Sequence, residues 1–271
     1  MSSITRKTDA QIATMRRAGR LVGHTLTLVS AAARPGVSLL ELDELAHKTI
    51  VEAGAVPSFL GYHGFPAVLC LSPNDRVVHG IPDETVLRDG DILSIDCGAI
   101  VDGWHGDAAL TVPVGDVPEE VAELLRVCEE AMWRGLAAAR LGGRVTDISA
   151  AVEGYVRSQG SYGLVEEYVG HGIGSAMHQP PNVPNFGRPG RGPRLVEGLA
   201  LAVEPMVTLG TKQTTVLEDD WTVVTTDGSW SAHFEHTFTL TEHGAWVLTA
   251  LDGGAGRLGD LGVPCAAAAA D

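Results

Sequence analysis

The stretch Ser94–Asp107, SIDCGAIVDGWHGD, decides how this chain folds, because it places two acids inside what looks like a buried strand hairpin. The apolar run 92–95 leads directly into Asp96, and Asp107 follows on the return. Between them, Asp102-Gly103 is typical of a two-residue hairpin loop. The sequence therefore predicts two antiparallel strands that each carry a carboxylate.

The hairpin loop also fixes which residues face each other. If residues 102 and 103 form the loop, Asp96 faces Ala109 and Gly98 faces Asp107. The two acids are then diagonal neighbours on one face, roughly 7–8 Å apart. Ionised carboxylates so placed repel each other unless a cation lies between them, and Gly98 and Gly106 leave room around them.

A simpler interpretation is that both acids face water, as turn acids such as Asp102 do. Burial of an unpaired carboxylate is costly, and no Lys or Arg lies between Arg88 and Arg126 to pair with Asp96. This favours a metal-binding role for the hairpin without excluding the solvated alternative.

The bulk composition is that of an ordinary globular protein. The chain has 271 residues, 45% hydrophobic and 20% charged, with a net charge of -15. Such an acidic chain repels phosphate, so direct nucleic-acid binding is not expected. The four cysteines are too scattered for a CxxC zinc motif and suit a reducing compartment. With no long apolar run and no secretory signal, we expect a cytoplasmic protein without a membrane span.

Periodicity predicts two helices followed by strands, twice over. A capping box at Thr8 begins the first helix, and Arg34-Pro35-Gly36 ends it. The second begins at Ser38 and ends near Gly54. The remaining expected elements are strands over 67–114, helices over 118–139 and 145–159, and strands over 165–248. Residues 251–271 are rich in Gly and Ala, and we expect a disordered tail there.

A weak internal repeat supports this order. LRDGDILSID (Leu87–Asp96) aligns with LVEGLALAVE (Leu195–Glu204) at an offset of 108 residues. We infer two similar α+β halves, at about 8–115 and 116–248, within one catalytic domain over 1–250. Chance similarity between short apolar strings is the alternative.

The second half supplies further acids at matching places. Glu204 ends the strand that matches the one ending in Asp96, Glu235 follows the Asp227-Gly228 turn, and His171 lies between glycines in VGHGIG. Two Asp, two Glu and one His suit a pair of divalent ions such as Mn, Fe, Co or Zn. Two such ions can hold one hydroxide and polarise a carbonyl, which makes peptide hydrolysis plausible.

Two other histidines stand in loops beside strand ends: His79 in VVHGIP and His178 in GSAMHQPP. Their spacing does not decide between a catalytic role and an ordinary loop position. Four more have no clear role and are expected to be structural, namely His63, His105, His233 and His236.

The sequence contains five motifs in this order: VVHGIP, DGDILSIDCGAIVDGWHGD, GHGIG, VEPMV and HFEHT. Together they resemble the type I methionine aminopeptidases, and the resemblance extends from about Gln11 to Thr249. The resemblance implies the α+β pita-bread fold, with two pseudo-symmetric halves around a dinuclear metal site. It implies a hydrolase that removes the initiator methionine from nascent polypeptides and Met-peptides when the second residue is small. His171 and Glu204 are only 33 residues apart, which leaves no room for the type II insertion.

The resemblance also implies a role for each matching residue. The metal ligands would be Asp96, Asp107, His171, Glu204 and Glu235, with Asp107 and Glu235 bridging two divalent ions. A hydroxide between the ions would be the nucleophile, and Glu204 its general base. His178 would bind the scissile carbonyl and the oxyanion, and His79 the substrate amide or leaving amine.

A methionine pocket is implied at Tyr62, Phe65, Cys70 and Trp221, an apolar lining that suits a thioether. Phe65 stands where the family often has tyrosine, and Met177 where it often has an aromatic residue, so the pocket departs from the family pattern at two positions. A monomer is expected, and the resemblance implies nascent chains at the ribosome among its substrates.

Two alternatives remain. A non-catalytic pita-bread binding protein would typically have lost metal ligands, whereas all five stand here. A proline-directed aminopeptidase of the same fold would carry a large N-terminal domain, which this sequence does not show.

Overall fold

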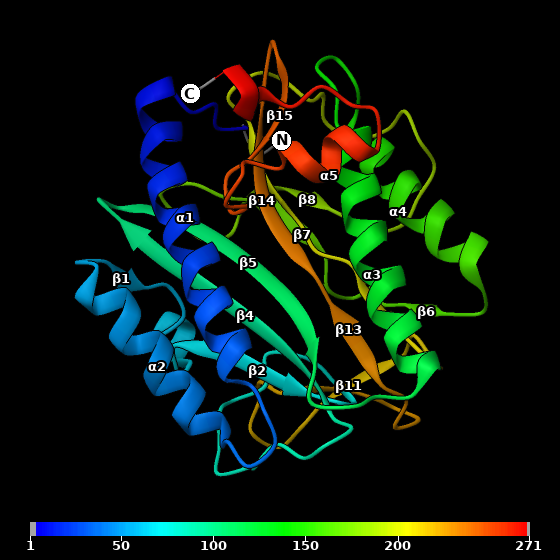
Figure 1. Cartoon of the computed structure of the whole chain (residues 1–271). Helices are drawn as coiled ribbons and strands as arrows, with labels where there is room; N and C mark the ends of the chain where they lie inside the picture. Colours follow the sequence, from blue (N-terminus) through cyan, green and yellow to red (C-terminus); the bar gives the residue numbers. More distant parts are fainter. Residues whose placement is uncertain (1–3, 270–271) are drawn as a thin grey trace.

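The computed structural model describes residues 4–269, in which helices lie against a large curved sheet (Figure 1), with two three-stranded sheets beside it. The helices are α1 (Asp9–Ala32), α2 (Leu39–Glu52), α3 (Glu119–Ala138), α4 (Val145–Gln159) and α5 (Ala255–Asp260), with 3-10 turns η1 (Tyr62–Gly64) and η2 (Ala266–Ala269). The strands are β1 (Val56–Pro57), β2 (Leu69–Pro73), β3 (Arg76–Val78), β4 (Ile92–Val101), β5 (Trp104–Pro113), β6 (Gly163–Leu164), β7 (Gly170–Gly172), β8 (Gln179–Val183), β9 (Ala200–Val203), β10 (Met206–Thr208), β11 (Thr214–Val216), β12 (Val223–Thr225), β13 (Ser231–His233), β14 (Glu235–Thr241) and β15 (Gly244–Val247). The two three-stranded sheets have the strand orders β13-β10-β6 and β11-β12-β3.

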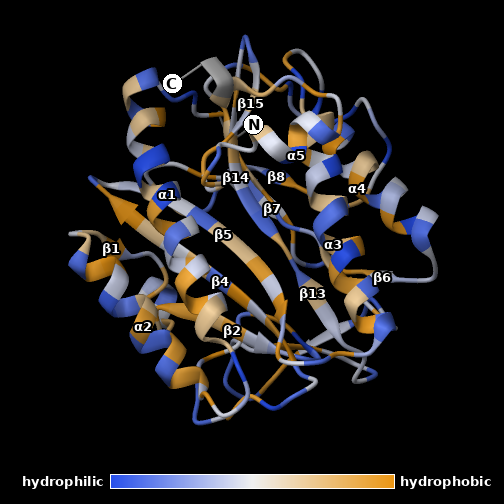
Figure 2. Cartoon of the chain, in the orientation of Figure 1, coloured by the Kyte–Doolittle hydropathy of each residue, from blue (hydrophilic) through white to orange (hydrophobic). Residues whose placement is uncertain are grey.

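The four long helices lie where the sequence predicts them. Thr8 and Ser38 each form a complete capping box, which fixes where α1 and α2 begin. Each long helix buries an apolar stripe, and the hydropathy colouring shows apolar and polar residues alternating around α2 and α3 (Figure 2). No helix between residues 4 and 269 is long and apolar enough to span a membrane.

The elements follow the 108-residue offset approximately. Helix α1 begins at Asp9 and α3 at Glu119, while β4 begins at Ile92 and β9 at Ala200. One apolar core lies around α1, α2 and β4, and another around α3, α4 and β9. These correspondences support the proposed halves.

One nine-stranded sheet joins strands from both parts of the chain. Its order is β1-β4-β5-β14-β9-β7-β8, with β2 paired to β4 and β15 paired to β14. The central contact is between β5 and β14, where Ala109 faces Glu235 antiparallel. The five strands from β4 to β7 are therefore neighbours, although residues 96 and 235 are far apart in sequence (Figure 1).

The predicted register of the β4–β5 hairpin is confirmed. Asp96 faces Ala109 and Gly98 faces Asp107, so both acids lie on one face. The expectation that Gly106 makes room near the acids is wrong. A Cβ there would lie 2.7 Å from the backbone nitrogen of Gly19. Gly106 therefore allows α1 to rest directly on β5, on the face opposite Asp107.

The expected disorder over residues 251–271 is contradicted for residues 251–269, while residues 270 and 271 lie outside the described part of the chain. Residues 255–260 form α5, in which Leu258 is fully buried. Arg257 pairs with Glu130 on α3 at 2.9 Å, and Ala245 and Cys265 form an isolated β-bridge. Composition does not reveal these contacts, because each one depends on a partner that is distant in sequence or on another element.

Candidate metal centre and peptide site

Five adjacent strands each contribute one of the predicted metal ligands. Asp96 lies on β4, Asp107 on β5, Glu235 at the start of β14, Glu204 directly after β9, and His171 on β7. In the sheet these strands follow one another in the order β4-β5-β14-β9-β7. The fold thus gathers residues spread over 140 positions into one row, which no local segment could do.

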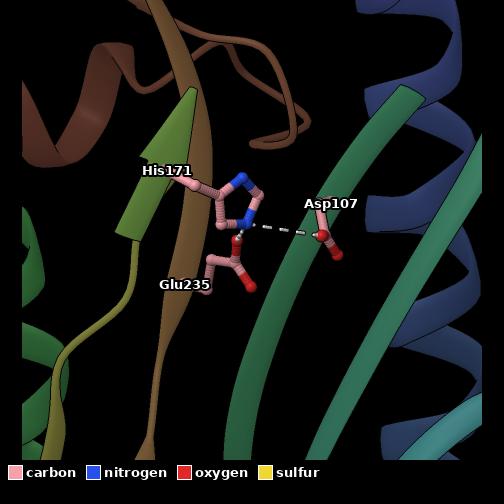
Figure 3. A group of neighbouring side chains, drawn as sticks. All are labelled: Asp107, His171 and Glu235. Atoms are coloured by element: carbon pink, nitrogen blue, oxygen red, sulfur yellow. Dashed lines mark ion pairs between the residues drawn. The ribbon is translucent and has the colours of Figure 1, made fainter. Parts of the chain in front are cut away.

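The side chains converge as well as the strands. His171 Nε2 lies 3.4 Å from Glu204 Oε1 and 4.0 Å from both Asp107 Oδ2 and Glu235 Oε1. Figure 3 shows the imidazole of His171 directed between Asp107 and Glu235. Ligand atoms of Asp107, His171 and Glu235 all lie within 4.8 Å of one another, which is close enough to share one ion.

The tautomer of His171 follows from its neighbours. Its Nδ1 lies 3.0 Å from the carbonyl oxygen of Gly172 and can donate a hydrogen bond to it. Burial lowers the pKa of this imidazole to about 3, with a further effect from the charge of His178. A neutral ring that donates from Nδ1 presents the Nε2 lone pair to the acids, the arrangement metal-binding histidines adopt.

Within residues 4–269, the buried carboxylates of the site have no Lys or Arg partner. Asp107 and Glu235 are only 4% and 2% exposed. Burial, followed by the charges of neighbouring acids, raises the pKa of both well above the usual range. Asp96 Oδ1, Asp107 Oδ1 and Glu235 Oε1 are buried without a hydrogen-bond partner among the described residues. Hard oxygen donors with unused lone pairs fit divalent cations, which would remove both the repulsion and the unmet bonding.

Protein stripped of metal by a chelator is therefore expected to lose stability as the pH rises. Burial raises the pKa of Asp96 from 3.8 to about 7. The folded state then binds more protons than the unfolded state between pH 4 and 7, so this contribution to stability falls across that window. Urea unfolding at pH 5 and pH 7 measures it, and Asp96→Asn is the control that should show a weaker pH dependence. An equal dependence in both proteins would contradict the expectation.

His79 and His178 both line the cavity that contains the acids. His178 Nδ1 is 2.8 Å from the hydroxyl of Tyr62, and its ring centroid is 4.3 Å from that of His171. His79 holds a left-handed backbone, φ 59°, at the end of β3. Burial lowers the pKa of His79 to about 4, so its ring is neutral at pH 7.

The predicted methionine-pocket residues form the apolar side of the same cavity. Tyr62, Phe65, Cys70 and Trp221 all line it. Phe65 and Trp221 meet edge to face, with ring centroids 5.1 Å apart. The lining places an apolar pocket directly beside the acids, which suits a substrate with an apolar side chain next to the bond that reacts.

Two residues of the site region were not identified from the sequence. Phe59 lies in the apolar lining, and His233 lies 3.8 Å from Glu204. No local pattern marks Phe59, because its position depends on the β1–η1 loop. Met177, which the sequence marked as a departure from the family pattern, also lines the cavity. The repeat of histidines in HFEH could have drawn attention to His233, which was expected to be structural.

The chain is similar in sequence to known metallopeptidases. Residues 13–242 match the model of Metallopeptidase family M24. A methionine aminopeptidase from Clostridium acetobutylicum is 51% identical over 244 residues, which cover 90% of this chain and 97% of the relative. Methionine aminopeptidase 1 from Mycobacterium tuberculosis is 50% identical over 252 residues, which cover 91% and 95%.

Solved structures give the same result. The methionine aminopeptidase from Rickettsia prowazekii aligns with a TM-score of 0.90 at 39% identity, over 92% of this chain and all of that one. The prolidase from Pyrococcus furiosus aligns with a TM-score of 0.74 at 21% identity, over 90% of this chain and 65% of that one, which shows a shared fold only. The predicted pita-bread fold is thereby confirmed, and the chain belongs to metallopeptidase family M24.

Proposed function

We propose that this chain is a methionyl aminopeptidase, a divalent-metal-dependent hydrolase that removes N-terminal methionine when the second residue is small. The observation that carries the proposal is the convergence of five candidate ligands, one from each of five adjacent strands, beside an apolar pocket in one cavity. Relatives at about half identity over nearly their whole length are methionine aminopeptidases, which supports the same activity.

The residues that would hold metal are Asp96, Asp107, His171, Glu204 and Glu235. Their unpaired buried oxygens and one neutral imidazole form a donor set that fits two divalent ions such as Co, Mn, Fe or Zn. When bound, such ions polarise a carbonyl and lower the pKa of water towards neutrality. Elemental analysis of the purified protein would count and identify them.

The apolar wall of the cavity would orient the substrate. Phe65, Cys70 and Trp221 would enclose the thioether of the first residue, for which a polarisable lining is favourable. The scissile amide would then lie between this wall and the acids, because both line one cavity. Correct orientation of the amide is worth several kcal/mol of the barrier.

Three side chains would transfer a proton or form hydrogen bonds during the reaction, namely Glu204, His178 and His79. Glu204, on the cavity wall, would accept the proton of the attacking water as general base. If the hydroxyl of Tyr62 donates to His178 Nδ1, then Nε2 carries the proton and can donate to the developing oxyanion. His79, which is neutral at pH 7, would form a hydrogen bond with the substrate amide or with the leaving amine.

Release of methionine from Met-Ala-Ser tests the proposal. Purified protein loaded with Mn or Co is expected to liberate free methionine, measured by chromatography, and to leave Ala-Ala-Ser intact. Met-Leu-Ser is expected to react much more slowly if the second residue must be small. No release of methionine from Met-Ala-Ser with any divalent ion would overturn the proposal in favour of a non-catalytic binding protein.

The family resemblance also supports the cellular part of the proposal. The substrates would be Met-peptides and nascent polypeptides in the cytoplasm, including those at the ribosome. The chain would act as a monomer with one catalytic domain over residues 1–250. Size-exclusion chromatography with light scattering measures the oligomeric state directly.

A further inference from the structure

His233 is a buried imidazole beside the metal centre that the five-ligand set does not include. The residue is 2% exposed, and its Nε2 is buried without a hydrogen-bond partner in the part of the chain that the structure describes. Leaving a buried polar nitrogen unpaired is unfavourable, because its hydration is lost without replacement. A side chain kept in this state needs a partner that the protein atoms around it do not provide.

The backbone of His233 is held firmly in place. His233 is the last residue of β13 and faces Met206 on β10. Met206 lies two positions after Glu204. Its amide donates to Thr111 Oγ1 at 2.8 Å, and its carbonyl accepts from the same hydroxyl at 2.9 Å. Thr111 lies on β5, the strand that carries Asp107, so His233 is fixed relative to the acids by two strands.

The ring of His233 is directed at Glu204. Its Nε2 lies 3.8 Å from Glu204 Oε2, while His171 Nε2 lies 3.4 Å from Oε1 of the same carboxylate. Glu204 therefore has one imidazole near each oxygen. A separation of 3.8 Å is too long for a hydrogen bond. It does suit two ligands of one ion, because each metal–ligand bond is about 2.0–2.2 Å long.

Glu204 and His233 belong to a cluster of three candidate metal ligands. Ligand atoms of Glu204, His233 and Glu235 all lie within 4.8 Å of one another, as do those of Asp107, His171 and Glu235. Glu235 is common to both clusters. The site therefore offers two overlapping sets of donors, each with one histidine.

We propose that His233 is a sixth metal ligand, which binds a divalent ion through Nε2 together with Glu204 and Glu235. The inference rests on the metal centre of the proposed function and extends its ligand set. A second imidazole should shift the preference of the site from Mn towards borderline ions such as Co, Fe or Zn, since nitrogen donors favour those ions.

Proton NMR of the fully Co²⁺-loaded protein tests the proposal directly. A histidine that binds Co²⁺ through Nε2 shows one strongly shifted, solvent-exchangeable signal from its Nδ1 proton. We expect two such signals in the wild-type protein and one in His233→Gln. A single signal in the wild type, or two in a folded His233→Gln, would overturn the proposal. The wild-type signal count decides even if the variant does not fold.

His236→Gln is the matched control. His236 is also buried and lies three residues further along, but its Nδ1 is 2.8 Å from Thr249 Oγ1 and its ring meets Trp133 on the other face of the sheet. This variant is expected to keep both signals. In chelator competition, His233→Gln should lose about tenfold or more in Co²⁺ affinity and less in Mn²⁺ affinity, whereas equal losses would contradict the shift in preference.

The test separates this inference from the proposed function. The NMR signals report ligation without any turnover. Methionine release from Met-Ala-Ser together with one signal would overturn only the assignment of His233. Two signals without release would overturn only the aminopeptidase activity.

Discussion

Asp107→Asn is expected to abolish methionine release and to leave the protein without its full complement of divalent ions. Asp107 lies at the centre of the site, 4.0 Å from His171 Nε2 and within one cluster with Glu235. An amide keeps the shape of the side chain but loses the charge and one of two donor oxygens. Mutation of a residue that only hydrogen-bonds to a metal ligand lowers metal affinity about 10–100-fold. Loss of a central ligand should therefore lower metal affinity by more than about 100-fold.

The metal-free Asp107→Asn protein should be more stable than the metal-free wild type, although it is inactive. Burial, followed by the charges of Glu235 and Asp96, raises the pKa of Asp107 well above its usual range, so the ionised side chain opposes folding when no cation is bound. Chelator-treated Asp107→Asn is therefore expected to unfold at a higher urea concentration than chelator-treated wild type at pH 7. Loss of activity combined with a gain in stability distinguishes a metal ligand from a residue that merely supports the fold.

Asp102→Asn provides the control in the same hairpin. Asp102 is exposed at the turn, where it pairs with Arg17 at 2.7 Å and adopts a left-handed backbone, φ 48°, that asparagine also tolerates. It should retain normal metal content, activity and stability. Two tightly bound ions in Asp107→Asn would remove this residue from the site.

His178→Ala is expected to keep its metals and to lose about 10²–10³-fold in kcat, the usual value of one oxyanion donor. His178 lies at the exposed side of the cavity and bonds to Tyr62, not to the acids. Its removal should therefore leave the ligand row intact. Steady-state kinetics on Met-Ala-Ser and elemental analysis of the same sample measure both quantities.

Tyr62→Phe is the companion variant. It removes the hydroxyl that orients His178 but keeps the donor itself, so its kcat should fall less than that of His178→Ala, with metal content unchanged. If metal content and activity fell together in His178→Ala, the side chain would be a ligand or a support for one, and its proposed role would be wrong.

Local patterns predicted the parts of the fold that depend on neighbours in sequence. The capping boxes at Thr8 and Ser38 and the apolar stripes placed the long helices, because helix ends and faces depend on residues three or four apart. The Asp102-Gly103 turn fixed the complete register of β4 and β5, because a two-residue loop leaves one pairing. Similarity to a family then supplied the wider arrangement.

Features that depend on distant contacts escaped prediction. Helix α5 forms because Leu258 and Arg257 find partners on other elements, which composition does not reveal. Gly106 faces α1 because that helix lies on β5, so its role could not be read from the hairpin alone. His233 looked like one of several unremarkable histidines until β13 placed it beside Glu204.

The sequence by itself determined the ligand types, the hairpin that presents Asp96 and Asp107, and the family to which the motifs point. These depend on side-chain chemistry and on turns of a few residues. Only the tertiary structure decided that β5 pairs with β14 and so joins the two acids to Glu235, Glu204 and His171. It also decided that His233 belongs beside them. Such pairings bring together residues more than a hundred positions apart, and they form because burying the whole sheet under its helices offsets the entropy of closing those long loops.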